Sequence, residues 1–386
     1  MEIYELLSVG AIILLGVLGG KLFHRFSIPK VTGYMVVGLV IGPSVFGLVS
    51  SSTLEDIHII NDIALGLILF AIGGEIEIHH LRAMGKKVIL MALAESLGAF
   101  IFVFLISVLI SNDFGLSVLL GAVSMATAPG VTLLVIREYH AHGDLTDSLL
   151  AVVALNNVIC LVVFRIFFAG YSMFMGESLI SVSLMLLKEL VLSVVIGVAV
   201  AVMITYWERK IEDISELLLV IIAGLLIGIG AGQTFGISHL IICLIIGAIT
   251  NNLSMMHRLI YAELRQTEMP FYIAFFVLSG ASLHLGALSH LGLLGLGYLV
   301  MRPVGKYIGS YWAGMRFGAE KRVYKNIGLG LLPQAGVAIG LALDVTERHP
   351  EIGIAISTVI LSSVVIYEGV GPFLTKVALG KAGEIP

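Results

Sequence analysis

The sequence is poor in charge. Only 12% of its 386 residues are Asp, Glu, Lys or Arg, whereas 58% are hydrophobic, and the mean hydropathy is +1.06. Soluble domains carry about twice that share of charged residues, so the chain is too apolar for a soluble fold. A net charge of −4 without basic patches also excludes a nucleic-acid-binding surface. The sequence therefore predicts a protein that lies in lipid.

Cysteine is scarce as well. Cys160 and Cys243 each lie alone in an apolar segment, without CxxC spacing, and we expect them to be small packing residues with no redox or metal role. The sequence also lacks a metal-ligand cluster, a nucleophile–base set and a phosphate-binding loop. We therefore expect no enzyme activity, no cofactor and no structural metal.

Long polar segments are missing too. The longest polar stretch is roughly residues 254–269. We therefore expect residues 1–386 to form a single membrane transporter unit without a soluble regulatory domain. The first apolar segment has no small-residue cleavage pattern, so we interpret it as a retained span rather than a signal peptide.

Apolar segments occupy most of the chain, and each is long enough to cross a hydrocarbon core of about 30 Å. The sequence predicts an all-α integral membrane fold with about thirteen transmembrane helices. The expected spans are residues 4–23, 31–49, 58–74, 86–110, 115–137, 147–169, 180–207, 215–231, 236–253, 270–287, 290–314, 323–343 and 352–379.

The distribution of positive charge predicts the orientation. Nearly all Lys and Arg residues outside the spans fall in one set of alternate loops and the C-terminal end, while the opposite set holds only Arg348. Positive loops face the cytoplasm. We expect a multi-pass protein of the cell (plasma or inner) membrane with its N-terminus outside and its C-terminus in the cytoplasm.

Two expected spans are interrupted at their centres by helix-breaking residues, Thr127-Ala128-Pro129-Gly130 in the fifth and Pro333-Gln334-Ala335-Gly336 in the twelfth. A membrane helix breaks at mid-depth only where protein, water or an ion meets the interrupted backbone, so paired breaks indicate a transport site. The alternative is that these residues merely kink ordinary packed helices.

When the sequence is aligned with itself at a single offset, the two breaks coincide, and residues 70–74 coincide with residues 276–280. The paired spans are seven apart, an odd number, so partners cross the membrane in opposite directions. This order predicts an inverted repeat, with repeat one at about 27–169 and repeat two at about 236–379.

Few polar side chains remain inside the spans, and two of them are adjacent amides. Asn156 and Asn157 lie near the middle of the sixth span, at the depth expected for the break at Thr127. Amide oxygens can bind a cation or the interrupted backbone, although an amide does not titrate near pH 7. The alternative is helix-to-helix hydrogen bonding, which contributes about 1–2 kcal/mol at most in membranes.

Charged residues at mid-depth count as functional candidates by default, and Glu95, Arg302 and Lys306 are three of them. Arg302 and Lys306 share one face of the eleventh span, where they repel unless a carboxylate lies between them, and Glu95 in the fourth span is the nearest one. Glu95 is then either the remaining titratable candidate or half of a structural ion pair. Glu368 is a weaker candidate, because we expect it close to the inner boundary.

Several motifs together resemble the monovalent cation/proton antiporter superfamily, in the branch of sodium/proton and potassium-efflux-type exchangers. The resemblance covers essentially the whole chain and is carried by residues 28–34, Gly38, Gly42-Pro43, 69–75, 126–130, 275–280 and 332–340. It implies a homodimer in which a core domain, with two crossed unwound helices, moves against a dimerisation domain. It also implies exchange of Na+ or K+ for H+ by alternating access, with Lys306 as the family's basic residue and Arg302 one turn earlier.

One position departs from this pattern. The family carries two adjacent acidic residues, or Asn followed by Asp, where this chain has Asn156-Asn157. An aspartate binds a proton and a cation in turn, whereas Asn takes no proton near pH 7, so direct coupling at these positions is in doubt. We expect Thr127, Asn156 and Asn157 to mark the ion site, with Lys306 and Arg302 balancing charge.

Three alternatives to an active exchanger stay open at this point. The chain is an uncoupled ion pathway, a transport-inactive membrane sensor or regulatory subunit, or an engineered form whose acidic pair was neutralised. The sequence does not choose among them.

Overall fold

The computed structural model describes residues 3–49, 54, 58–74, 85–176, 179–210, 214–254, 256–282 and 292–385. Most of these residues are helical and none forms a strand, so the all-α class is confirmed. The helices are α1 (Ile3–Arg25), α2 (Lys30–Ile41), α4 (His58–Gly74), α6 (Lys86–Ser111), α7 (Phe114–Ser124), α8 (Pro129–Glu138), α9 (Asp144–Phe174), α10 (Leu179–Glu208), α11 (Ile214–Phe235), α12 (His239–Leu253), α13 (His257–Ala281), α15 (Gly292–Arg316), α16 (Lys321–Gly330), α17 (Gly336–Arg348) and α18 (Pro350–Ala382).

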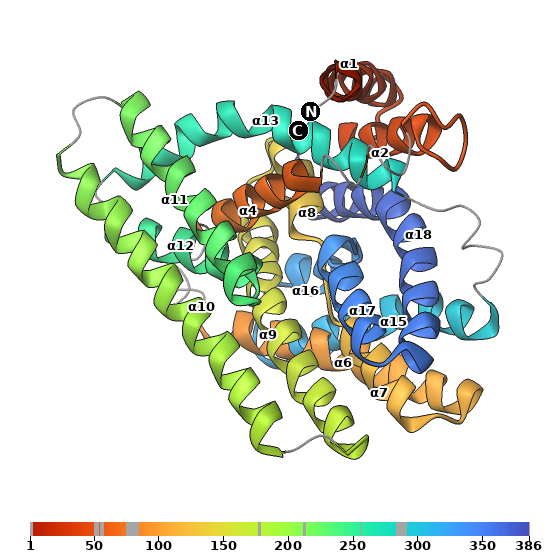
Figure 1. Ribbon diagram of the computed structural model, residues 1–386. Helices are drawn as coiled ribbons and strands as arrows, with labels where there is room; N and C mark the ends of the chain where they lie inside the picture. The colour runs from red at the N-terminus through yellow and green to blue at the C-terminus, as the bar shows by residue number, and fades with distance from the viewer. Residues whose placement is uncertain are drawn as a thin grey trace.

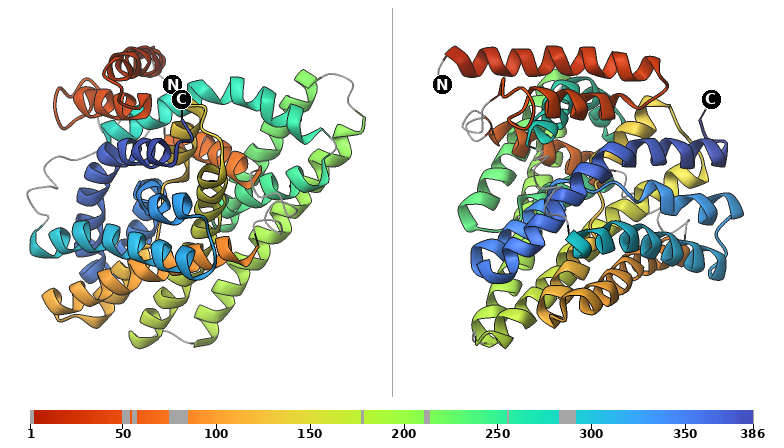
Figure 2. Two further views of the ribbon diagram at one scale, coloured as in Figure 1. Left: turned by 180° about the vertical axis from the view of Figure 1, so that it is seen from behind. Right: turned by 90° about the vertical axis from the view of Figure 1, so that its right-hand side faces the viewer.

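Among the described residues, 7 segments are long and apolar enough to cross a membrane, and shorter apolar helices occur as well. The protein is thus a multi-pass membrane protein, while thirteen spans stay a prediction. The two chain ends lie on opposite sides of the molecule when α1 is viewed from its side (Figure 2, right).

The tenth expected span, residues 270–287, begins later than the helix itself, because α13 begins at His257. Ile260, Leu264 and Glu268 are all buried and recur at every fourth residue. This spacing places them on one helical face, which packs inward.

The helices form two groups that differ in their packing partners. In the first group, α2 packs against α1 and α13, and α4 packs against α12 and α13. Helix α11 packs against α4, α12 and α13. The second group comprises α6 to α9 and α15 to α18, with α6 and α15 in the most extensive contact. Helix α10 packs against α9, α11 and α12, and it runs along one edge of the molecule in Figure 1.

Helices α6 and α15 approach each other closely at two glycines. A Cβ atom on Gly98 would clash with the carbonyl oxygen of Gly305, and one on Gly305 would clash with that of Gly98. Glycine permits this backbone contact because it has no side chain. The contact fixes the register of the pair and brings Glu95, on α6, to the depth of Lys306, on α15.

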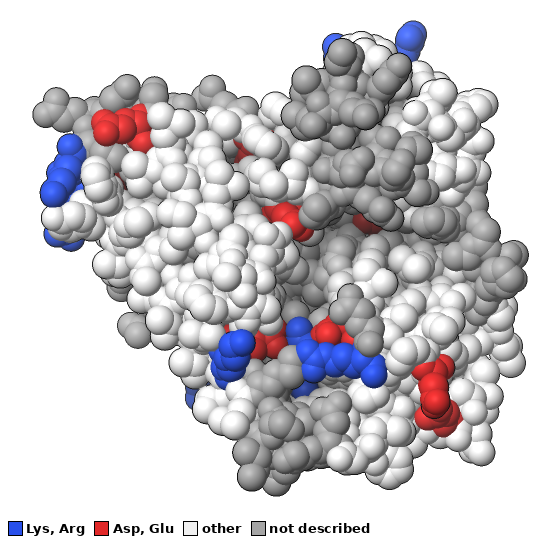
Figure 3. All heavy atoms as spheres, in the orientation of Figure 1, with Lys and Arg blue, Asp and Glu red and all other residues white. Residues whose placement is uncertain are grey.

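Large apolar side chains cover much of the exposed surface. On α6, for example, Leu97, Ile101, Leu105 and Leu109 are between 47% and 80% exposed. Among the residues that Figure 3 colours blue, red or white, charged atoms form a few separate groups between larger white areas. Such a surface fits hydrocarbon rather than water.

Candidate functional site at two helix breaks

The two predicted interruptions are present. Helix α7 ends at Ser124 and α8 begins at Pro129, while α16 ends at Gly330 and α17 begins at Gly336. The breaks contact each other, because the backbone N–H of Ala128 donates to the carbonyl oxygen of Pro333 over 2.9 Å. The hydroxyl of Thr127 also lies 3.5 Å from the carbonyl oxygen of Leu331. That the broken helices cross at the membrane midplane stays a prediction.

Arg302 bridges the two breaks. Its side chain is 0% exposed, and Nε donates to the carbonyl oxygen of Ser124, Nη2 to that of Ala126 and Nη1 to that of Leu332, over 2.7–3.0 Å. These acceptors lie at or just beyond the C-terminal ends of α7 and α16, where helix dipoles place negative partial charge. The aromatic ring of Tyr367, on α18, covers the guanidinium at 4.5 Å. The guanidinium is therefore paired with dipoles and a π-face rather than with a carboxylate.

Lys306, one turn later on α15, binds the carboxylate instead. Its Nζ donates to Glu95 Oε2 over 2.7 Å, and to the Met125 carbonyl oxygen and Thr127 Oγ1, each over 2.9 Å. All three ammonium protons are thus used. Both members of this ion pair are 0% exposed. Of the two partners that the sequence allowed for Glu95, the structure selects Lys306.

Asn156 completes the cluster around Glu95. Its Nδ2 atom lies 2.5 Å from Glu95 Oε1, 2.8 Å from Ser96 Oγ and 2.9 Å from the Met125 carbonyl oxygen. Ser96 also donates to Glu95 Oε1 over 3.0 Å. Both carboxylate oxygens are therefore bonded, whereas the Oδ1 atom of Asn156 is buried without a partner.

The remaining predicted residues lie outside this cluster. Asn157 donates back to the Val153 carbonyl oxygen of its own helix over 2.8 Å, and its Oδ1 atom is also buried without a partner. Gln334, in the second break, exchanges hydrogen bonds with the Tyr298 hydroxyl and donates to the Val123 carbonyl oxygen over 3.3 Å. The structure thus brings Glu95, Asn156, Lys306 and Thr127 together but leaves Asn157 beside them.

Glu368 lies within α18, away from both of its ends, while its distance from the inner membrane boundary stays a prediction. Its neighbour Tyr367 stacks on Arg302, and a Cβ on Gly371 would contact Pro333 in the second break. Helix α18 is 33 residues long, which places Glu368 near its middle. The proline that follows, Pro372, lies inside the helix and does not end it, so it marks no boundary.

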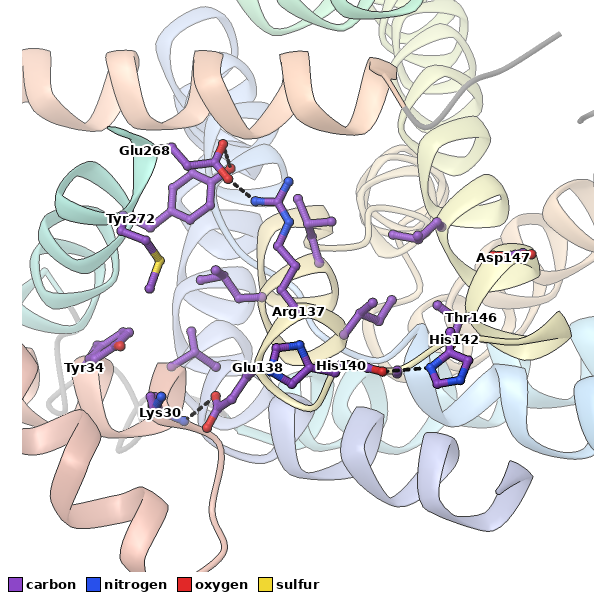
Figure 4. A pocket seen from close by; sticks show the side chains of 17 residues that line it. Lys30, Tyr34, Arg137, Glu138, His140, His142, Thr146, Asp147, Glu268 and Tyr272 are labelled. Atoms are coloured by element: carbon purple, nitrogen blue, oxygen red, sulfur yellow. Dashed lines mark hydrogen bonds and ion pairs between the residues drawn. The ribbon is translucent and has the colours of Figure 1, made fainter. Parts of the chain in front are cut away.

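A cavity of about 690 Å³ opens where the two helix groups meet, between α2, α8, α13 and the start of α9 (Figure 4). At one side, Arg137 of α8 forms an ion pair with Glu268 of α13, which also accepts a hydrogen bond from Tyr272 over 2.9 Å. At the other, Glu138 accepts from the backbone N–H of Lys30 over 2.8 Å. These contacts join the second group to the first.

Tyr139, just beyond α8, lies next to these contacts. Burial, followed by the neighbouring Glu138 carboxylate, raises the pKa of Tyr139 to about 12, so its phenol stays neutral at physiological pH. Sequence reasoning did not identify Arg137, Glu138 and Glu268 as a unit. Each is a polar residue at the end of a span, and only the folded chain brings them to one cavity.

Known proteins resemble this chain over most of its length. The ammonium/H(+) antiporter subunit AmhT of Alkalihalophilus pseudofirmus is 23% identical over 350 residues, 89% of this chain and 87% of the relative. The Na(+)/H(+)-K(+) antiporter GerN of Bacillus cereus is also 23% identical, over 89% of this chain and 88% of the relative.

A solved structure has the same fold. The sodium proton antiporter MjNhaP1 of Methanocaldococcus jannaschii at pH 8 superposes with a TM-score of 0.73 at 17% sequence identity, covering 98% of this chain and 95% of the other. The family model for the sodium/hydrogen exchanger, transmembrane, matches residues 10–376. The match thus extends over both breaks and over every residue of the cluster around Glu95. The chain belongs to the sodium/hydrogen exchanger family, a family of membrane transporters rather than enzymes.

Proposed function

We propose that the protein is a secondary transporter that exchanges a monovalent cation, Na+ or K+, for H+ by alternating access. The observation that carries this proposal is the buried Glu95–Lys306 ion pair at the contact between two helix breaks. A buried ion pair costs desolvation and is weak evidence for a stabilising role. Its position among interrupted backbone groups is instead typical of a transporter site.

The cation site that we propose uses neutral oxygens. The Oδ1 atoms of Asn156 and Asn157 are buried without hydrogen-bond partners. A third neutral oxygen, Thr127 Oγ1, accepts a hydrogen bond from Lys306. Several such oxygens together can replace part of the hydration shell of a monovalent ion, as carbonyls do in selectivity filters. Lys306 and Arg302 balance charge, and Glu95 is the titratable group in contact with Lys306.

We propose that repeat one (about 27–169) and repeat two (about 236–379) are the two inverted structural repeats of this transporter. Support comes from reciprocal glycine contacts. A Cβ on Gly38 of α2 would clash with the backbone of α13, and a Cβ on Gly280 of α13 would clash with the backbone of α2. Likewise, a Cβ on Gly73 of α4 would clash with the backbone of α12, and one on Gly247 of α12 with that of α4. In the alignment of the halves, α2 corresponds to α12 and α4 to α13, so each contact is the counterpart of the other.

The proposed assembly follows from the family resemblance, and the proposed location and orientation follow from the distribution of positive charge along the sequence. We propose a homodimer whose first helix group forms the dimerisation domain and whose second group is the moving core. We also propose the cell (plasma or inner) membrane as its location, with the N-terminus outside and the C-terminus in the cytoplasm. In this orientation the cavity at Arg137 and Glu268 opens to the cytoplasm.

Transport by purified protein in vesicles tests the function. We expect Na+ or K+ pulses to dissipate a pH gradient across proteoliposomes, and we expect the double variant N156D/N157D to raise this exchange strongly, because a carboxylate lets one charge bind proton and cation in turn. N112D, at the end of α6, is the matched control. If the double variant gains nothing over the parent, Asn156 and Asn157 do not mark the ion site.

A second candidate function has a specific observation in its favour. Both amides are neutral, and Glu95 is fully compensated by Lys306, Asn156 and Ser96. Such a scaffold suits an uncoupled ion pathway or a transport-inactive sensor or regulatory subunit. Currents on solid-supported membranes discriminate, because an uncoupled pathway carries a cation current without pH dependence and a sensor carries none.

A further inference from the structure

Glu368 is a buried acid that the proposed site does not use. It is 1% exposed, and neither carboxyl oxygen has a hydrogen-bond partner. The other buried carboxylates of the described residues, Glu95, Glu189, Glu208 and Glu268, each have at least one hydrogen-bond or ion-pair partner. Glu368 is therefore the one buried acid in the described part of the chain with no partner at either oxygen.

An ionised carboxylate without a partner is very costly in an apolar interior, and the group takes up a proton instead. Even the neutral acid pays for an unbonded hydroxyl. Glu368 thus contributes no contact that would explain it structurally. Intramembrane acids without a structural partner are functional candidates.

The charge around the breaks gives this acid a role. Arg302 and Lys306 carry two positive charges, and Glu95 supplies one negative charge through its bond to Lys306. Arg302 is held by backbone carbonyls and by the ring of Tyr367, and no carboxylate of the described residues pairs with it. With Glu368 neutral, the buried region keeps one excess positive charge; with Glu368 ionised, that charge is balanced.

The charged groups on the helices packed against α18 are committed to other partners or exposed, and none of them is paired with Glu368. On α15, Arg302 lies against Tyr367, the residue before Glu368, and Lys306 is committed to Glu95. On α17, Asp344 pairs with Arg165 of α9. On α8, Arg137 pairs with Glu268 and Glu138 accepts from Lys30 of α2, while the basic residues of α16 are exposed at its first turns.

We propose that Glu368 is a second proton site of the transporter. In the described conformation it holds a proton; when the helix groups move and water reaches it, it releases the proton and adds a negative charge to the buried region that contains Arg302 and Lys306. Proton release then lowers the repulsion that a cation meets at the breaks. This inference rests on the proposed exchange function for its consequence, but not for the titration itself.

The titration is measured first, without transport. A hydrophobic carbodiimide reacts with protonated carboxyls in apolar surroundings, and mass spectrometry locates the adduct. We expect an adduct at Glu368 that disappears at alkaline pH, and an infrared C=O band of a protonated acid that E368Q removes. E351Q, an exposed acid in the first turn of the same helix, is the matched control and keeps the band. No adduct and no band at any pH, or an adduct and band that do not change with pH, would overturn the proposal.

Transport then separates this inference from the proposed function. Because Glu368 makes no hydrogen bond, E368Q should unfold at the same temperature as the parent, and its exchange should lose part of its dependence on pH. If the parent exchanges cations and E368Q keeps the full pH dependence, the inference fails while the proposed function stands. If Glu368 titrates in a parent that exchanges nothing, the proposed function fails while the proton site stands.

Discussion

Asn156 and Lys306 donate to the same two groups. The amide Nδ2 and the ammonium Nζ lie 2.5 and 2.7 Å from the Glu95 carboxylate, and each lies 2.9 Å from the carbonyl oxygen of Met125. One donor comes from α9 and the other from α15, on either side of the first break. Position 156 is therefore a donor position in this fold, and an acid there would meet Glu95 as well as Lys306.

The two adjacent amides should accordingly differ when each is replaced by aspartate. In N156D a second carboxylate lies against Glu95, and two like charges at that distance cannot both ionise freely. We expect N156D to lose stability as pH rises, because ionisation of both acids destabilises only the folded state. N157D also buries an acid without a partner and should lose stability as pH rises, but it lacks the added repulsion from Glu95, so its change with pH should be smaller. Thermal unfolding in detergent at acidic and alkaline pH compares them, and equal pH dependence would contradict the arrangement around Glu95.

The Glu95–Lys306 pair should show strong coupling in a double-mutant cycle. Removing one partner of a buried ion pair leaves an uncompensated charge and costs about 3–5 kcal/mol. We expect E95Q and K306M each to lower the free energy of unfolding by about that amount, and the double variant to lower it by less than the sum. Denaturant titrations in mixed micelles provide the values. Additive effects would show that the pair is not formed in solution.

Arg302 should hold the two breaks together through its shape rather than its charge. In R302K the charge remains, but one ammonium cannot reach carbonyls of both breaks as the planar guanidinium does. Hydrogen bonds to charged groups contribute about 1.5–3 kcal/mol each, so loss of one or two should loosen the breaks. We expect faster amide hydrogen exchange over residues 125–128 and 331–335. R316K, at the exposed end of α15, is the control, and protection equal to the parent would disprove the bridge.

The contact between α6 and α15 should not tolerate a methyl group. G98A places a Cβ against the carbonyl oxygen of Gly305, so the helices must separate or shift. Overpacking of this kind costs about 1–3 kcal/mol. We expect a lower melting temperature and weaker exchange, because Glu95 and Lys306 lose their register. G10A in α1, where no atom lies within 4 Å of the added Cβ, is the matched control and should be neutral.

Orientation can be tested with single cysteines, since Cys160 and Cys243 are both buried. Lys381 is exposed at the end of α18 and Met175 is 52% exposed at the end of α9. In intact cells, we expect a membrane-impermeant maleimide to label M175C but to label K381C only after the membrane is opened. The reverse pattern would invert the proposed topology.

The sequence by itself determined the class, most helix positions and the location of both breaks. These properties depend on hydropathy and on proline and glycine, which act locally along the chain. It also placed Glu95 at the depth of Arg302 and Lys306, because spans of similar length put their middles at one level. The sequence analysis placed the start of α13 too late, because many polar residues in 254–269 hide the periodicity of the buried Ile260 and Leu264.

Only the tertiary structure decided which groups touch. Arg302 and Lys306 lie one turn apart on the same face of α15. Lys306 nevertheless forms the ion pair with Glu95, whereas Arg302 donates hydrogen bonds to backbone carbonyls of both breaks. Asn156 and Asn157 are neighbours in sequence, but successive helical residues point about 100° apart, so only one reaches Glu95. The depth and isolation of Glu368 likewise follow from how α18 packs on Pro333. Contacts at hydrogen-bond distance depend on helix register and rotation, which the close backbone approach of α6 to α15 fixes and which hydropathy does not encode.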